Sequence, residues 1–514
     1  MKNKLVKSSI IVVVAGFISK IIGAVYRIPL SNLLGPQGMG GYQMVYPIFA
    51  FALVFVCGGV QVSLARVVAQ KRATNTGGQK KDLFNAIAFC FVTSILFSLC
   101  FIFLNNQICA IQGNPNGRLG IACLSIALVF ASITAPIKGY FEGKENMIPS
   151  AISSITEQIA KLCFGLLFAF LFAKKGIEYA IFGACLGVSV AEIISFVAIL
   201  FCALSIKRKS LQIKTAHLNN NLTQFRLFKD AIPLSFSAIV FPFVSLISSF
   251  LVVNLLSSYT NTQIAVSLYG VQSGMVAPLI NFPATISLSL GVAFLPNYSY
   301  LLSLQKNHKK SLSSMLFFVW LFALPCTVGF FVLSKQILAL LYPFLTGESL
   351  EIAISLLKIS SIGIVFIAIF QICISALQAM ARGVTCLVIS FITAIFNISL
   401  MIILVQIPQV GILGVAISNT FGFAIGAVLA LWQTKKHGEF NMPINKSILP
   451  LVFSLAMGIF IYLLSRITQG FPLILQSCLL VIFGVALYFA FIFGFKVLAF
   501  GGAKVDKCSA KDIK

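Results

Sequence analysis

Fourteen long, mostly apolar runs follow one another along this chain of 514 residues. A helix that crosses a bilayer needs about 20 such residues. Only helices and closed barrels satisfy the backbone in lipid, and these runs are continuous rather than alternating in polarity. We therefore predict fourteen membrane-spanning helices, at residues 7–29, 42–68, 83–104, 119–140, 150–173, 178–205, 230–256, 266–298, 312–333, 353–379, 384–405, 411–434, 448–467 and 474–497.

The composition excludes the main soluble classes of protein. Hydrophobic residues make up 59% of the chain and charged residues only 10%, whereas about 25% of a soluble domain is charged. A soluble enzyme and a nucleic-acid-binding protein are therefore both excluded. The 13 cysteines include no CxxC pair and lie mostly in apolar runs, so we expect no disulfide framework, metal site or cofactor. The predicted fold class is an all-α polytopic membrane protein.

The basic residues predict the orientation in the membrane. The net charge is +25, with 37 Lys and Arg residues. If the N-terminus is cytoplasmic, fourteen spans place 26 of these residues in inner segments and 5 in outer loops. Lys and Arg accumulate on the cytoplasmic side of membrane proteins. Both termini are therefore expected to be cytoplasmic.

The longest hydrophilic stretch, residues 206–229, suggests how the chain is divided. It separates an N-terminal six-helix lobe at 1–205 from a C-terminal six-helix lobe at 230–434. Helices 13 and 14 follow at 435–497, and a basic tail at 498–514. Residues 41–47 weakly resemble 269–278, and 148–156 weakly resemble 385–393. A six-plus-six repeat with a site between the lobes is a common plan of transporters.

Charged residues within the spans point to a binding site for an anion. Each such charge costs roughly 2.5–3.5 kcal/mol at the bilayer centre, so it needs a partner or a wet cavity. Lys20 and Arg27 are seven residues apart in the first span, on the face that also carries Gly16 and Gly23. They favour a retained helix over a signal peptide. Their stripe predicts a cavity wall that receives an anion; the alternative is two cations bound by neighbouring carbonyl groups.

Other intramembrane charges have a functional and a structural interpretation. Glu157 and Lys161 have the i,i+4 spacing of a helical ion pair, which could be structural or could line the same cavity. Arg66, Lys138 and Lys358 lie near span ends, where snorkelling to the interface accounts for them. Our candidates for substrate binding are Lys20, Arg27, Arg66 and Lys161. Glu157 and Glu192 are the candidates for coupling to a proton or ion.

Three segments of the first 160 residues resemble a known family. Residues 20–30 read KIIGAVYRIPL, residues 34–47 read LGPQGMGGYQMVYP and residues 138–151 read KGYFEGKENMIPSA. In these segments the chain resembles the stage V sporulation protein B-like polysaccharide transporters of the MOP flippase superfamily, which are related to MurJ-type lipid II flippases. Beyond residue 160 the resemblance depends mainly on the number and layout of spans.

The resemblance implies a fold, a cargo and a location. The fold is two six-helix lobes in a V-shaped, MATE-like arrangement, with two further helices outside. The cargo is a lipid-linked anionic oligosaccharide, peptidoglycan lipid II or a related undecaprenyl-pyrophosphate-linked sugar, moved to the outer leaflet for cell-wall, spore-cortex or polysaccharide synthesis. Arg27 matches the family's cavity-facing arginine. The implied protein is a monomer in a bacterial cell membrane, in contact with membrane lipids and with cell-wall synthesis proteins.

Departures from the family pattern keep alternatives open. Span two has Gly59-Val60-Gln61 where the family often has Gly-Ile-Pro, and span eight, 266–298, carries no charge. The cavity would then be basic mainly in the N-terminal lobe, which weakens lipid II as the specific cargo. A cation-coupled multidrug exporter of the same superfamily is the main alternative, and a membrane glycosyltransferase or ligase is a weaker one. The sugar and the energy source stay open.

Overall fold

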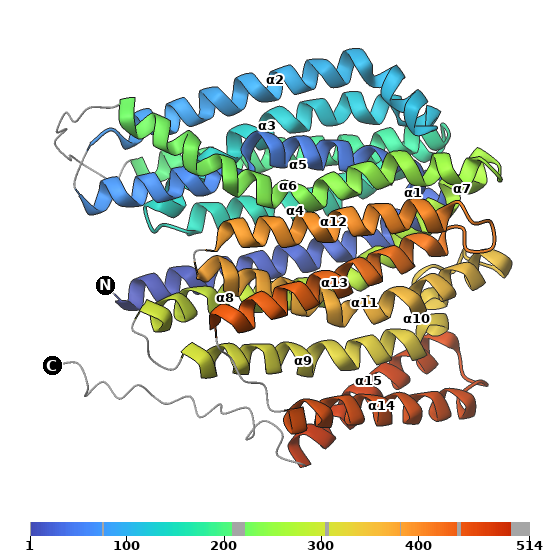
Figure 1. Ribbon diagram of the computed structural model, residues 1–514. Coiled ribbons are helices and arrows are strands. Elements are labelled where there is room, and N and C mark those ends of the chain that lie inside the picture. Colours follow the sequence, from blue (N-terminus) through green and yellow to red (C-terminus); the bar gives the residue numbers. More distant parts are fainter. Residues whose placement is uncertain are drawn as a thin grey trace. The chain divides into compact units, whose positions relative to one another are not determined.

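The computed structural model describes residues 2–74, 77–207, 221–303, 308–380, 382–438 and 444–494, and these residues form helices without any strand (Figure 1). The predicted linker at 206–229 and tail at 498–514 fall partly or wholly outside these ranges. The long helices are α1 (Lys2–Ala73), α2 (Gln79–Gln112), α3 (Arg118–Gly143), α4 (Ile148–Ala173), α5 (Ile177–Lys207), α6 (Asn221–Ser257), α8 (Ala277–Ser303), α9 (His308–Val332), α11 (Gly347–Ala379), α12 (Gly383–Val405), α13 (Leu413–Gly438), α14 (Ile444–Ile467) and α15 (Leu473–Gly494). Shorter elements are α7 (Thr262–Gly270) and α10 (Ser334–Leu341), together with the single turns η1 (Pro115–Gly117) and η2 (Val271–Val276).

Helix α1 is two helices joined at Gly35. That residue has φ 64° and ψ −178°, a backbone conformation that is essentially restricted to glycine. Within the described residues, 13 stretches are long and apolar enough to cross a membrane, and the first, Ala15–Arg72, has 58 residues. A crossing needs about 20, so this stretch holds two. The fourteen predicted spans are thereby confirmed.

Apolar side chains cover much of the outer surface of these helices, as lipid contact requires. Phe103 on α2 is 77% exposed and Val384 on α12 is 76% exposed. In water, patches of this kind would drive aggregation. In a bilayer they face hydrocarbon at no cost, because lipid tails are as apolar as the side chains.

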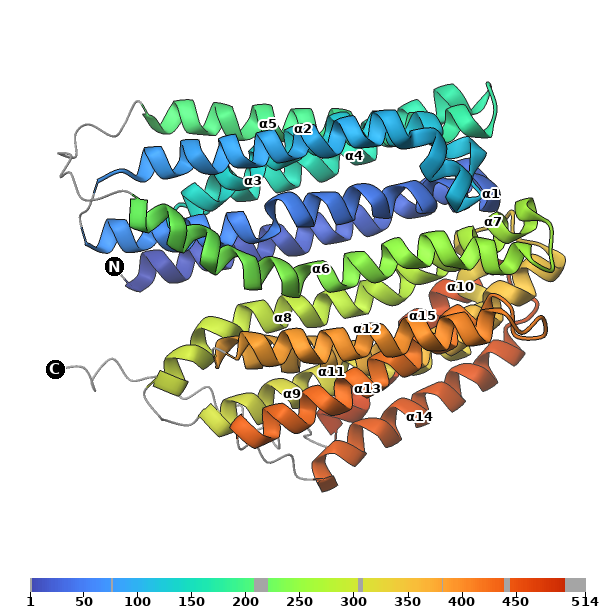
Figure 2. The same ribbon diagram turned by 45° about the horizontal axis from the view of Figure 1, so that its top comes forward.

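The helices divide into two compact units by their contacts. The first comprises Met1–Pro278 with Ser390–Val415, and the second comprises Leu279–Ile389 with Ala416–Lys514. In the first unit, α4 packs against α5, and α1 contacts α3, α4 and α6 (Figure 2). This grouping places α6 and α7 with the N-terminal helices. The predicted lobes at 1–205 and 230–434 follow sequence order instead, and they stay a prediction.

Glycines let α1 and α7 approach very closely within the first unit. A Cβ added at Gly40 would collide with the carbonyl of Val266, and one at Gly270 with the carbonyl of Pro36. Next to this contact the chain forms a single π-helical segment, Val271–Val276. Its Ser273 carbonyl accepts a hydrogen bond of 3.1 Å from Gln43 Nε2. The segments 41–47 and 269–278, which weakly resemble each other in sequence, therefore pack against each other.

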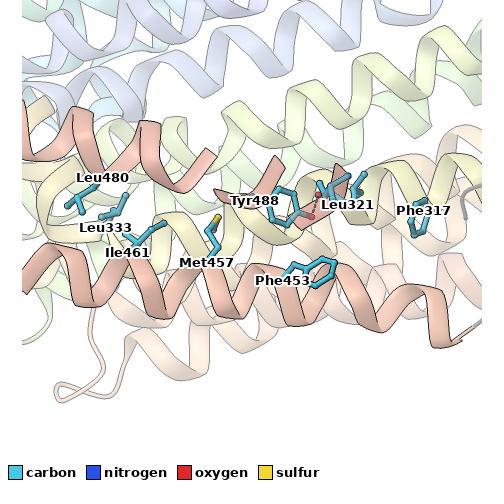
Figure 3. Close-up of a cluster of buried hydrophobic side chains, with 9 residues drawn as sticks. Phe317, Leu321, Leu333, Phe453, Met457, Ile461, Leu480 and Tyr488 are labelled. Carbon is cyan, nitrogen blue, oxygen red and sulfur yellow. Dashed lines mark hydrogen bonds between the residues drawn. The ribbon is translucent and has the colours of Figure 1, made fainter. Parts of the chain in front are cut away.

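In the second unit, α14 and α15 pack on α9 through a buried apolar cluster (Figure 3). Phe453, Met457 and Ile461 of α14 meet Leu480 and Tyr488 of α15 in this cluster. The Tyr488 hydroxyl donates a 2.7 Å hydrogen bond to the Leu321 carbonyl of α9. The C-terminal helix pair is therefore attached to the second unit by apolar packing and one buried polar contact.

The charge distribution predicts the side of each loop. A green fluorescent protein fused after residue 514 should fluoresce, because it folds in the cytoplasm. Alkaline phosphatase inserted in the loop between α10 and α11 should be active, because that enzyme requires an extracytoplasmic location. The opposite pattern at both sites would contradict the cytoplasmic termini.

Candidate functional site

A polar stripe runs along one face of α4. Ser150, Ser153, Ser154, Glu157 and Lys161 are spaced three or four residues apart, so their side chains lie on the same side of the helix. The remaining positions of α4 are mostly apolar, and Ile152 and Phe170 are exposed. The stripe therefore faces the interior of the first unit while the opposite face contacts lipid.

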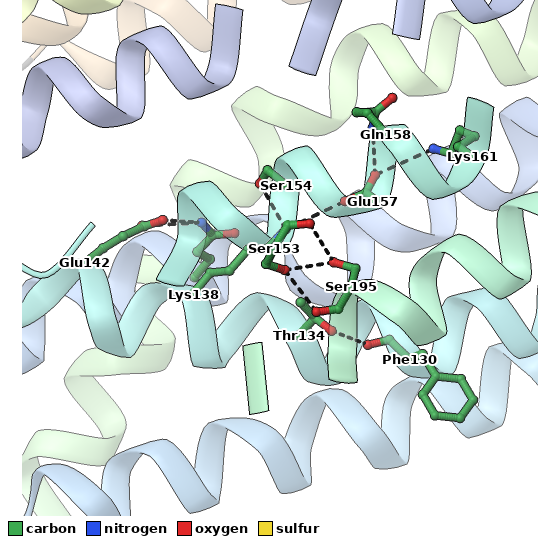
Figure 4. A network of polar contacts seen from close by, with 11 residues as sticks. Phe130, Thr134, Lys138, Glu142, Ser153, Ser154, Glu157, Gln158, Lys161 and Ser195 are labelled. Carbon is green, nitrogen blue, oxygen red and sulfur yellow. Dashed lines mark hydrogen bonds and ion pairs between the residues drawn. The ribbon is translucent and has the colours of Figure 1, made fainter. Parts of the chain in front are cut away.

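Glu157 is the centre of this stripe (Figure 4). Its Oε1 lies 3.6 Å from Lys161 Nζ on the same helix, and its Oε2 lies 3.7 Å from Lys138 Nζ on α3. The Gln158 amide donates a 2.9 Å hydrogen bond to Oε1. The side chains of Lys138, Glu157 and Lys161 are only 14%, 17% and 9% exposed. One carboxylate thus neutralises two buried ammonium groups only in part.

Hydroxyl groups fix the helices around this cluster. Lys138 Nζ donates to Ser154 Oγ at 3.2 Å, which links α3 to α4. Ser153 and Ser195 share a 2.8 Å hydrogen bond between their hydroxyls, which links α4 to α5. These contacts satisfy polar groups that would otherwise be costly in an apolar interior. They hold the charged side chains at a defined register.

Glu192 on α5 is a second carboxyl group in this region. It is 5% exposed and interacts electrostatically with Glu157, Lys161 and Lys138. Across the described ranges of the chain it makes no hydrogen bond or ion pair. Neighbouring Ser189 and Ser195 bond to other groups: Ser189 donates to the Cys123 carbonyl, and Ser195 pairs with Ser153. Glu192 is therefore close to the lysines without being bound by them.

The first half of α1 packs against α4 and carries two more cations, Lys20 and Arg27. Gly23, between Lys20 and Arg27, lies against the side-chain oxygen of Gln158. Tyr26 packs on Gly165 of α4, and its buried hydroxyl has no hydrogen-bond partner in the structure. Tyr26 also interacts electrostatically with both Lys161 and Arg27. The small residues allow α1 and α4 to approach closely.

Lys20 and Arg27 differ from the other buried cations because they are not neutralised. Both are partly exposed, and neither has an ion pair among the residues that the structure describes. The region contains four cations, at positions 20, 27, 138 and 161, and two carboxyl groups, at 157 and 192. The excess is positive, so the site has the electrostatic character of an anion receptor.

The structure bears on several sequence-based interpretations. The spacing of Glu157 and Lys161 correctly indicated an ion pair. The snorkelling interpretation of Lys138 is wrong, because that side chain is buried against Glu157 and Ser154. Lys358 is exposed but lies about three turns inside α11, which begins at Gly347, so its snorkelling stays a prediction. Arg66 is exposed and no contact joins it to the cluster in the described residues; its role in substrate binding stays a prediction.

Comparison with known proteins identifies the family. The model of the polysaccharide biosynthesis protein family matches residues 5–302, more than half of the chain. The chain belongs to the polysaccharide biosynthesis protein family. The segments of α1 and of α3–α4 that resemble this kind of protein lie within the matched residues. The four cations of the site, at positions 20, 27, 138 and 161, lie within them as well.

Individual members and a solved structure refine this assignment. The chain is 24% identical over 437 residues to stage V sporulation protein B of Bacillus subtilis strain 168, covering 83% of each chain. It is 23% identical over 497 residues to the lipid II flippase MurJ of the same organism, covering 89% of this chain and 88% of the relative. A solved structure titled lipid II flippase MurJ, inward closed conformation, matches 95% of this chain and 99% of its own length at a TM-score of 0.73 and 19% identity. The chain is thus a multi-pass membrane protein of the MOP flippase superfamily, and the predicted fold class is confirmed.

The Glu157 cluster predicts a specific loss of stability. Glu157→Gln leaves two buried ammonium groups without a carboxylate, and we expect it to destabilise the protein by roughly 3 kcal/mol, the lower end for a buried pair because some exposure remains. Thermal unfolding of detergent-purified protein measures this. Adding Lys161→Met should restore part of the loss, because it removes one of the unpaired cations.

Glu142→Gln is the matched control for this measurement. Glu142 is partly buried but accepts hydrogen bonds from the neutral amide of Gln61, at 3.1 and 3.3 Å. Its substitution should change the unfolding temperature little. Equal losses for both substitutions would show that the lysines do not depend on Glu157.

Proposed function

We propose that this protein moves an undecaprenyl-pyrophosphate-linked oligosaccharide, lipid II or a related precursor, from the inner to the outer leaflet of a bacterial cell membrane. The family and its flippase members support transport of a lipid-linked sugar. The lipid II flippase relative is named for transport rather than for an enzymatic reaction, which agrees with a non-enzymatic role. The sugar would serve cell-wall, spore-cortex or other polysaccharide synthesis.

The observation that carries this proposal is the pair of unneutralised cations on α1. Lys20 and Arg27 lie on one face of a membrane helix and have no counter-charge among the described residues. Such charges are expensive in hydrocarbon unless a partner or water compensates them. A pyrophosphate group supplies that partner. The planar guanidinium of Arg27 suits two phosphate oxygens at once, and Lys20 adds a point charge.

The rest of the transport cycle follows from this assignment. The polar head group would enter a basic cavity bordered by α1 and α4, while the prenyl tail stays in lipid. The two lobes would alternate in access around that cavity, as in other repeat-built transporters. We place both termini in the cytoplasm, treat the protein as a monomer, and expect cell-wall synthesis proteins as partners that supply or consume the cargo.

A cation-coupled drug exporter is the second candidate. Such an exporter needs an unpaired intramembrane acid to bind a cationic drug or its coupling ion. Here Glu157 already pairs with two lysines, and Glu192 is buried beside them. A cationic drug would be repelled by the surplus positive charge. The flippase is therefore the better-supported function.

Arg27→Ala tests the proposal. We expect binding of a pyrophosphate-linked lipid to weaken roughly ten- to hundredfold, which corresponds to a charged hydrogen bond of about 1.5–3 kcal/mol. Arg27→Lys should retain part of the affinity, because the charge remains without the bidentate geometry. Binding of a labelled ligand to protein in nanodiscs measures the effect.

Arg466→Ala is the control for Arg27→Ala. Arg466 is an exposed arginine on α14 that donates to the Tyr462 hydroxyl at 2.7 Å, away from the α1 stripe in sequence. Its loss should leave binding unchanged. Unchanged binding in Arg27→Ala would contradict the assigned role of that residue.

A further inference from the structure

Glu157 occupies the place that an anionic ligand would take. It lies between the ammonium groups of Lys138 and Lys161, from two different helices. Two cations that converge on one point form the usual binding pattern for a phosphate oxygen. In this structure the point is filled by a carboxylate of the protein itself.

We propose that Glu157 is an internal counter-anion that the pyrophosphate of the cargo displaces, and that Glu157 takes up one proton when it is displaced. This inference rests on the proposed function, because it assumes that the cargo carries a phosphate group. It adds a defined link between proton binding and cargo binding. The carboxylate takes one proton from the acid form of the buffer and becomes the neutral carboxylic acid, while the buffer keeps its conjugate base.

The contact distances favour displacement of this carboxylate. Direct ammonium–carboxylate hydrogen bonds measure about 2.7–2.9 Å. Lys71 and Asp82, which join the end of α1 to the start of α2, are that close, at 2.6 Å. Glu157 lies 3.6 and 3.7 Å from its two lysines, and Lys138 donates its hydrogen bond to Ser154 instead. The two lysines attract the Glu157 carboxylate electrostatically, but neither is within the distance of a direct hydrogen bond to it.

The surroundings explain why the displaced carboxylate takes up a proton. The titratable groups around the cluster are Tyr26 and Tyr46 on α1, Lys138 on α3, Lys161 on α4 and Glu192 on α5. If the ligand binds these two lysines together with Lys20 and Arg27 of α1, as proposed above, no cation of the region remains for Glu157. Only the amide of Gln158 would still donate to it. A buried carboxylate without a counter-charge costs several kcal/mol, and protonation removes that cost.

The sign of the pH dependence follows from this exchange. The complex holds one more proton than the free protein, so acid favours the complex. Uptake of one proton corresponds to about a tenfold change in affinity per pH unit. Lowering the pH should therefore tighten binding, and raising it should weaken binding. The extra proton also reduces the negative charge that must cross the membrane.

The test is calorimetric binding to the full-length protein in nanodiscs, with a short-chain polyprenyl-pyrophosphoryl sugar as the probe. The probe is a pyrophosphate diester, which avoids the phosphate-monoester titration near pH 6. Titrations at several pH values between about 6 and 8, each in two buffers of different ionisation enthalpy, give affinity and proton uptake together. We expect about tenfold tighter binding per unit fall in pH and uptake of about one proton.

Variants separate Glu157 from other titrating groups. Glu157→Gln should bind with little pH dependence and more tightly than the wild type at the highest pH, because the internal competitor is gone. Glu157→Gln combined with Lys138→Met has fewer unpaired cations and should also lose the pH dependence, so the test stands if the single variant is unstable. Glu178→Gln, at the start of the same helix as Glu192, should behave as the wild type.

The outcomes distinguish this inference from the proposed function. Tight binding by the wild type without pH dependence would overturn the proton link and leave the flippase proposal intact. A full pH dependence retained in either Glu157 variant would do the same. Absence of probe binding at every pH would overturn both.

Discussion

The structure of the first unit depends on the cost of placing charge in hydrocarbon. A chain with so few charged residues carries several of them inside its spans, where each requires a partner or water. Lys138 and Lys161 meet this requirement through Glu157. Lys20 and Arg27 do not meet it within the described residues, although Gly23 and Tyr26 hold that part of α1 close to α4. The uncompensated charge is the feature on which the proposed anion-binding role rests.

Close packing of the helices brings these charged side chains into one region of the first unit. Small residues bring α1, α4 and α5 together: Gly165 accepts the ring of Tyr26 and also lies against Gly187. The Ser153–Ser195 pair links α4 to α5. At the other contact of α1, Gly40 and Gly270 permit close packing with α7. The adjacent π-helical segment contains Ser273, whose carbonyl accepts a hydrogen bond from Gln43. Such segments often mark functional positions in helices.

Sequence reasoning predicted the parts of this structure that depend on local patterns. Apolar run length was sufficient for the spans, because lipid imposes a minimum length on each crossing. The i,i+4 spacing was sufficient for Glu157 and Lys161. Lys138 could not be assigned to the same cluster, since its partner lies on another helix and the register between α3 and α4 is set by tertiary packing. The compact units likewise depend on contacts between distant segments, such as α12 with α6, which no local pattern encodes. The π-helical break inside the predicted span 266–298 also gave no recognisable signal.

We propose above that the cations of α1, α3 and α4 in the first unit carry a lipid-linked pyrophosphate across the bilayer. The most direct measurement is the leaflet distribution of a labelled lipid-linked precursor in cells from which this protein is depleted, read by the accessibility of the sugar to an enzyme added outside. We expect the precursor to accumulate in the inner leaflet, protected from the enzyme, and to become accessible again when the wild-type protein is restored but not when Arg27→Ala is supplied. An unchanged outer-leaflet fraction on depletion, in cells without another flippase for that precursor, would contradict it.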